Sequence, residues 1–100
     1  MNIAVIVGEI LNNATCRGSK TKALLFTVVT KNGGTDGEKE LTSFVPCVVF
    51  NPPADLERRL TSGGKGLLIE LQGRVNCSRP EGELKYNAEV IVYTKSITLR

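Results

Sequence analysis

Residues 41–60 read LTSFVPCVVFNPPADLERRL and join the two kinds of element that decide the fold. The first ten of these residues predict a β-strand that is apolar on both faces, because successive side chains of a strand point to opposite sides. One face carries Val45, Cys47 and Val49. The other face carries Phe44, Pro46, Val48 and Phe50. We expect the first set to enter a core and the second set to lie outside it.

The second half of this stretch predicts a short helix. Asn51 can cap it, since asparagine is a favoured residue at helix starts, and Pro52-Pro53 suits a first turn. Leu56 and Leu60 supply one apolar stripe. The helix should end before Ser62, where GGKG over residues 63–66 predicts a flexible turn.

Four further stretches have the composition of strands, namely residues 1–11, 20–30, 67–75 and 83–94. Gly8 marks a bulge or a point of close approach in the first of them. The order is therefore three strands, one helix and two strands, without βαβ alternation. It predicts an all-β fold, a five-stranded oligonucleotide-binding (OB) barrel with one short helix between strands 3 and 4. Residues 1–100 are expected to form one domain.

Composition argues against several classes of protein. The chain has 100 residues, a net charge of +3 and no histidine, so a serine or cysteine nucleophile lacks its usual base and an enzyme is not expected. The cysteines are Cys16, Cys47 and Cys77, without a CxxC pair, which predicts neither a metal site nor a disulfide framework. We expect two of these cysteines to be buried in strands and one to lie in a loop. The scarcity of paired cysteines also predicts a reducing compartment, so we expect the protein to be cytoplasmic. No cofactor and no membrane span are predicted, since the longest apolar runs are strand-sized.

Aromatic residues are the first candidates for a binding site. Exposed Phe44 and Phe50 would suit unpaired bases, because base stacking on aromatic rings tolerates any sequence. The alternative is that both rings cap the core or pack in a subunit interface. Phe26, between Leu24 and Val28, is expected in the core. Tyr86 and Tyr93 should lie on opposite faces of the fifth strand, and Tyr86, beside Lys85, is the better candidate for a contact.

Basic residues accompany the same strands and loops. As a group they could neutralise the phosphates of a nucleic-acid strand, whereas any one of them could equally serve solubility. The candidates are Lys22, Lys31, Arg74, Arg79 and Lys85. Arg58 and Arg59 share the helix with Asp55 and Glu57 and are read as mixed surface charge.

The whole chain resembles the bacterial and phage single-stranded DNA-binding protein family. The resemblance is carried by IAVIVGEI (3–10), ALLFTVVT (23–30), FVPCVVF (44–50), GGKG (63–66), ELQGRV (70–75) and KYNAEV (85–90), in the family's order. It places Phe44 and Phe50 at stacking positions. Tryptophan is absent, and Gly33 and Pro80 stand where many members have aromatic residues, so weaker affinity is expected.

The resemblance implies a role and partners. The role is sequence-tolerant binding of single-stranded DNA in replication, recombination or repair. The partners are the DNA strand, further copies of this chain in a dimer or tetramer built in part on the first strand, and other replication or recombination proteins. A primosomal replication protein N-like adaptor is the related alternative. A protein-interaction barrel, binding through Phe44, Val48 and Phe50, is an alternative of another class.

Overall fold

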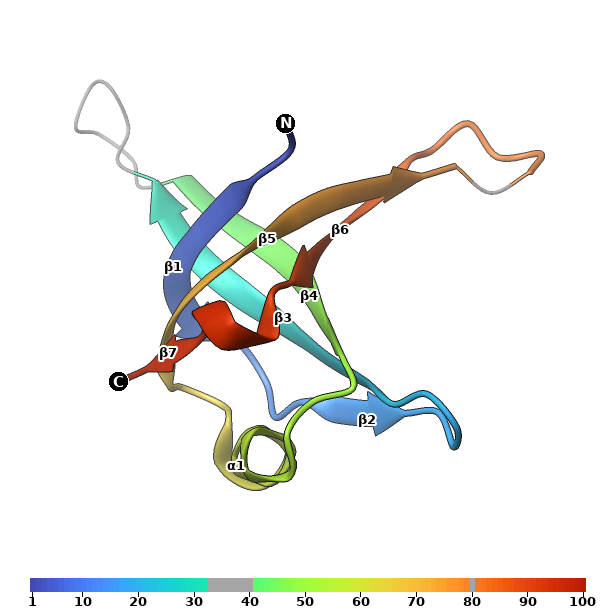
Figure 1. The fold of residues 1–100 in the computed structure, drawn as a ribbon. Coiled ribbons are helices and arrows are strands. Elements are labelled where there is room, and N and C mark those ends of the chain that lie inside the picture. The colour runs from blue at the N-terminus through green and yellow to red at the C-terminus, as the bar shows by residue number, and fades with distance from the viewer. Residues whose placement is uncertain (33–40, 80) are drawn as a thin grey trace.

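The computed structural model describes residues 1–32, 41–79 and 81–100 (Figure 1). Its strands are β1 (Ala4–Ile10), β2 (Thr15–Arg17), β3 (Ala23–Asn32), β4 (Leu41–Phe50), β5 (Leu68–Ser78), β6 (Asn87–Val92) and β7 (Thr98–Leu99). The helix α1 (Ala54–Gly63) lies between β4 and β5, and a 3₁₀ turn, η1 (Thr94–Ser96), precedes β7. The expected third strand has the bounds that the sequence predicts.

Five of these strands close into a barrel. Their order is β1-β3-β4-β6-β5, and β5 pairs back onto β1 from Ala4–Gly73 to Glu9–Leu68. All of these pairings are antiparallel except that of β4 with β6, which is parallel at Cys47–Val90 and Val48–Ile91. The predicted fold class is confirmed, with the helix between the third and fourth barrel strands.

One face of each barrel strand points its side chains into the interior of the barrel. The fully buried side chains include Leu24 and Val28 of β3, Val49 of β4, and Ile69 and Leu71 of β5, and Phe26 is buried as expected. Leu60 of α1 is also fully buried, which contributes about 1.5–3 kcal/mol of transfer free energy. The Leu60 carbonyl accepts a hydrogen bond from the Ala14 amide at 2.9 Å, so α1 is joined to the segment after β1.

Both ends of the helix differ from the expectation, since α1 continues through Ser62 to Gly63 instead of ending before Ser62. Asn51 does not cap it, because α1 begins three residues later, with Pro53 at the N-cap and no side-chain capping bond. Asn51 instead has a positive φ of 50° and donates its amide to the Lys22 carbonyl at 2.8 Å, which turns the chain out of β4. Leu56 packs against the core and Leu60 lies within it, as the stripe predicts.

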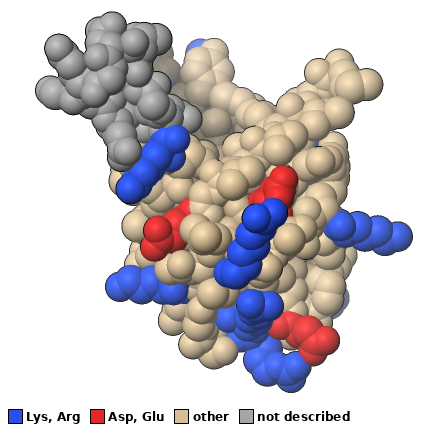
Figure 2. Space-filling model, turned by 90° about the vertical axis from the view of Figure 1, so that its left-hand side faces the viewer, with Lys and Arg blue, Asp and Glu red and all other residues tan. Residues whose placement is uncertain are grey.

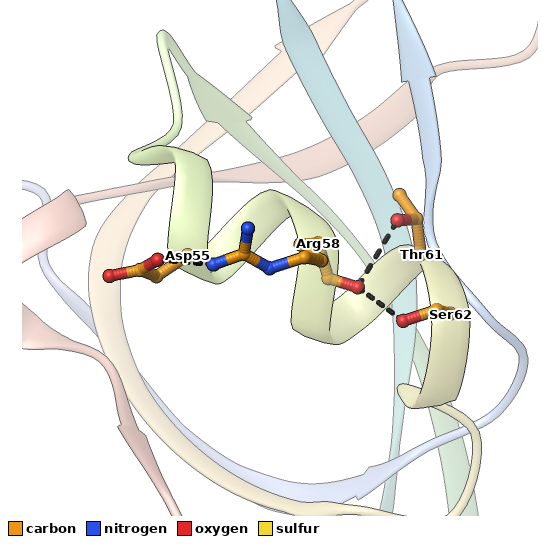
Figure 3. A network of polar contacts seen from close by, with 4 residues as sticks. All are labelled: Asp55, Arg58, Thr61 and Ser62. Atoms are coloured by element: carbon orange, nitrogen blue, oxygen red, sulfur yellow. Dashed lines mark hydrogen bonds and ion pairs between the residues drawn. The ribbon is translucent and has the colours of Figure 1, made fainter.

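The outward face of α1 is polar. Asp55 accepts a bond from Arg58 at 2.6 Å, and the Arg58 carbonyl accepts the hydroxyls of Thr61 and Ser62 (Figure 3). Mixed surface charge is therefore the correct reading of Asp55 and Arg58. Within the described residues, no helix is long and apolar enough to cross a membrane.

The starts of two strands and the burial of the cysteines also differ from the expectation. The second strand starts at Ala23, after a turn with Gly18 at φ 97°, and the last barrel strand starts only at Asn87. Two short edge strands, β2 and β7, were not predicted. All three cysteines lie in strands and are free, but only Cys47 is buried, whereas Cys16 is half-buried and Cys77 exposed. The expected pair of buried cysteines is therefore wrong.

Gly8→Ala should lower the free energy of unfolding by about 1–3 kcal/mol. The added Cβ would overlap the carbonyl oxygen of Val29 and lie 2.8 Å from Val28 Cγ1, where β1 turns from β5 toward β3. Urea unfolding followed by circular dichroism measures the change. Gly63→Ala is the control, since a Cβ there meets nothing within 4 Å. Equal midpoints for Gly8→Ala and wild type would contradict this close approach.

Candidate nucleic-acid interface

The strand register places side chains of four strands in rows across the outer face of the barrel. Directly paired residues share a face. Leu25 of β3 pairs with Val48 of β4, Val48 with Ile91 of β6, and Ile91 with Arg74 of β5. A second row joins Thr27 to Pro46 and Asn76 to Glu89. We call the surface over these two rows, with Phe44 and Phe50, the outer face.

The two phenylalanines lie on this face as predicted. Phe44 is 61% exposed and Phe50 46% exposed, while Cys47 and Val49 between them are buried and Val45 packs against the core. Six residues of a strand separate the two rings by about 20 Å. They therefore mark the two ends of β4 on one surface.

Val48 is the exception to the expected pattern. It was placed with the exposed residues, but only 3% of it is accessible, although it does not belong to the core cluster. Its strand is central, and Leu25 and Ile91 stand on either side of it. These larger neighbours cover the short valine side chain, so the middle of the outer face is closed and its ends are open.

Two hollows meet on the outer face and share Pro46 and Glu89. One extends from these residues toward Asn12, Asn13 and Thr15 after β1. The other extends toward Ser78 and Tyr86, at the base of the β5–β6 hairpin. We call these two hollows together the outer groove, and in both of them β4 contributes Pro46 to the lining.

The five candidate basic residues are spread around this face. Lys31 of β3 pairs with Thr42, which lies two residues before Phe44 on β4. Arg74 of β5 pairs with Ile91, at the end of the first of the two rows. Arg79 lies over the Tyr86 ring at 5.7 Å, and Lys85 is exposed beside it. Lys22, at the Phe50 end, lies 3.5 Å from Glu57 of α1, so this cation is partly compensated. Figure 2, which views the left-hand side of Figure 1, shows Lys and Arg interspersed with acidic residues on that side of the molecule.

The tyrosines differ from the expectation in position. Neither lies in β6, because Tyr86 precedes it and Tyr93 follows it. Tyr86 is exposed and lines the outer groove, so it remains the better candidate of the two. Gly33 and Pro80 lie outside the described residues.

Sequence reasoning missed the polar residues of the groove. Asn12, Asn13 and Glu89, which line the groove, and Asn76, which pairs with Glu89, are not among the predicted site residues. In the sequence, Glu89 stands out only as part of KYNAEV (85–90). The outward alternation of residues 87–92, with Val90 and Val92 buried, was the available signal.

A polar cluster behind Phe50 links β2 to the helix. The Glu57 carboxylate accepts a hydrogen bond from the Cys16 thiol, and this bond raises the pKa of Cys16. The same bond lowers the pKa of Glu57, and the positive charge of Lys22 lowers it further. Burial raises the pKa of Cys47 to about 12. In the part of the chain that the structure describes, no three His, Cys, Asp or Glu side chains gather as a metal site would require.

Thiol labelling should distinguish the exposed Cys77 from the buried Cys47. At pH 8 dithiobis(nitrobenzoate) should modify exposed Cys77 rapidly, and Cys47 only on unfolding, because its buried thiol stays protonated below about pH 12. Absorbance of the released thiolate measures the rates. The Cys16→Ser, Cys77→Ser variant should lose the fast phase, and a fast phase that persists in this variant would contradict the burial of Cys47.

Comparison with known proteins gives a likeness among solved structures. No family model matches this chain, and neither does any curated protein. Among solved structures, it is similar to a Plasmodium falciparum SSB complex with ssDNA. The TM-score is 0.75 at 19% sequence identity, over 99% of this chain and 92% of that chain. This likeness shows that the two chains share a fold.

Proposed function

We propose that this protein binds single-stranded DNA with little sequence preference, and that the outer face is where the strand lies. The observation that carries the proposal is the exposure of Phe44 and Phe50 at the two ends of β4, on either side of the outer groove. Exposed rings cost hydration free energy unless a partner covers them, and unpaired bases are flat apolar partners. The shared fold with an SSB that was solved with ssDNA supports this reading.

In the proposed mechanism, aromatic rings contact the bases and basic side chains contact the phosphates. Phe44 and Phe50 stack on bases, and each stack contributes about 1–3 kcal/mol. Lys31, Arg74, Arg79 and Lys85 neutralise phosphates along the margins, and Tyr86 adds a further ring at the hairpin. Lys22 contributes less, because Glu57 already compensates its charge. This is a binding role without a chemical step.

The Phe44→Leu, Phe50→Leu double variant should bind labelled oligothymidine at least about 30-fold more weakly, since it loses two stacks worth about 1 kcal/mol or more each. Fluorescence anisotropy at several salt concentrations measures this. Wild-type affinity should fall with salt, with a log–log slope of about −0.7 per neutralised phosphate.

The matched control is Phe44→Tyr, Phe50→Tyr, which keeps both rings and should keep most of the affinity. Circular dichroism confirms that each variant is folded. Wild type that fails to bind oligothymidine at low salt would overturn the proposal. Equal affinities of the leucine and tyrosine variants would show that stacking is not the mode of contact.

The alternative of a protein-interaction barrel is weaker on this surface. It relied on a continuous patch of Phe44, Val48 and Phe50, but Val48 is covered. Two separated rings beside a polar groove suit a chain of bases better than one apolar protein surface. Roles in replication, recombination or repair, or as a primosomal replication protein N-like adaptor, rest on the sequence resemblance, whereas the expected cytoplasmic location rests on composition.

We also propose that the protein associates with itself through β1. Ile3, just before this strand, and Val5 and Val7 within it are each more than half exposed, and Leu68 of β5 lies near Val7. A row of exposed aliphatic side chains is a usual mark of an interface. A small domain also gains stability when such a surface is covered.

Val5→Asp, Val7→Asp should convert a dimer or tetramer into a monomer, because charges cannot enter an apolar interface without partners. Sedimentation velocity of wild type and variant at micromolar concentration measures the molar mass. Wild type that sediments as a monomer of 10.8 kDa at this concentration would contradict self-association through β1.

A further inference from the structure

Glu89 occupies an unusual place for an acidic residue, at the junction of the two hollows of the outer groove. Its side chain is half-buried and points outward from β6, because the adjacent Val90 points into the core. The residue is therefore held within the groove and is not part of the solvated rim.

One oxygen of the Glu89 carboxylate accepts a single hydrogen bond, and an ionised carboxylate has about four acceptor sites, so both oxygens can still take a ligand. The Asn76 side-chain amide donates to Oε1 at 3.4 Å, from the directly paired position on β5. Within residues 1–32, 41–79 and 81–100, no Lys or Arg forms an ion pair with Glu89. Asn76 thus helps to orient a carboxylate that keeps acceptor capacity toward the groove.

This charge determines which part of a DNA strand can lie at the junction. A phosphate near Glu89 would be repelled, whereas N–H groups of a base would be attracted. The phosphates must therefore follow the margins, where Arg74 and Arg79 lie, and the bases must face the groove. A carboxylate accepts hydrogen bonds but cannot donate them, so it distinguishes base edges by their donors.

The Watson–Crick edge of an unpaired base is available to such an acceptor. Guanine presents two adjacent donors, N1–H and N2–H, that match the two oxygens of one carboxylate. Cytosine and adenine each present one amino group next to an acceptor nitrogen. Thymine presents one N–H between two carbonyl oxygens, which a carboxylate repels.

We propose that Glu89 is a specificity-determining residue, which makes the outer groove prefer guanine at one nucleotide of an otherwise sequence-tolerant strand. The inference rests on the proposed binding of single-stranded DNA. Stacking on Phe44 and Phe50 tolerates any base, so the preference is confined to the nucleotide at Glu89.

The test compares twelve-nucleotide oligothymidines that carry one central dG, dC, dA or deoxyinosine. Wild type should bind the dG oligonucleotide roughly tenfold more tightly than oligothymidine itself, the discrimination typical of one bidentate pair. Deoxyinosine lacks the N2 amino group and should lose most of this gain. Fluorescence anisotropy at one fixed salt concentration gives each affinity.

The Glu89→Gln variant separates this role from a general effect of charge. It should lose the preference for dG and bind oligothymidine more tightly than wild type, since the repelling charge is gone. Asp55→Asn makes the same change of charge on α1 and should leave both quantities as in wild type.

The outcomes separate the two proposals. Wild type that binds oligothymidine and the dG oligonucleotide equally, with no change in Glu89→Gln, would overturn the role of Glu89 and leave DNA binding intact. Absence of binding to every oligonucleotide at low salt would overturn the proposed function instead. Equal gains in oligothymidine affinity in Glu89→Gln and Asp55→Asn would also contradict the inference, because the effect would then be one of net charge.

Discussion

Strand β4 has a hydrogen-bonded partner on each edge, and this double pairing constrains the rest of the structure. Ten residue pairs tie it to β3, from Ala23–Phe50 to Asn32–Leu41, and its other edge runs parallel to β6. Because side chains alternate along a strand, burying Cys47 and Val49 leaves Phe44 and Phe50 outside. A slip of one residue would exchange the two sets, which would bury two rings and expose the core residues.

The same constraint explains why the outer face is suited to a single strand of nucleic acid. Leu25 and Ile91 stand on either side of the buried Val48 of the central strand, so the face has a closed apolar middle between two open rings. Cations stand around it and a carboxylate lies within the groove. This arrangement gives bases and phosphates different places, which a patch of uniform charge would not do.

The sequence was sufficient for those parts of the fold that depend on local pattern. The bounds of β4, the presence of a helix after it and the outward position of Phe44 and Phe50 follow from alternation and from the proline and glycine positions. The burial of Val48 could not be predicted, because it depends on side chains from two strands distant in the sequence. The same holds for the compensation of Lys22 by Glu57 and for the groove position of Glu89, which the register of β5 and β6 determines.

Chemical-shift mapping of the backbone amides during titration with a short oligothymidine tests the central claim most directly. The account predicts that the largest shifts fall on the outward residues of β3, β4 and β6, around Phe44, Phe50 and Glu89. Amides of α1 and of the first half of β1 should change little. Shifts concentrated on α1 or β1, with β4 unaffected, would show that the outer face is not the binding surface.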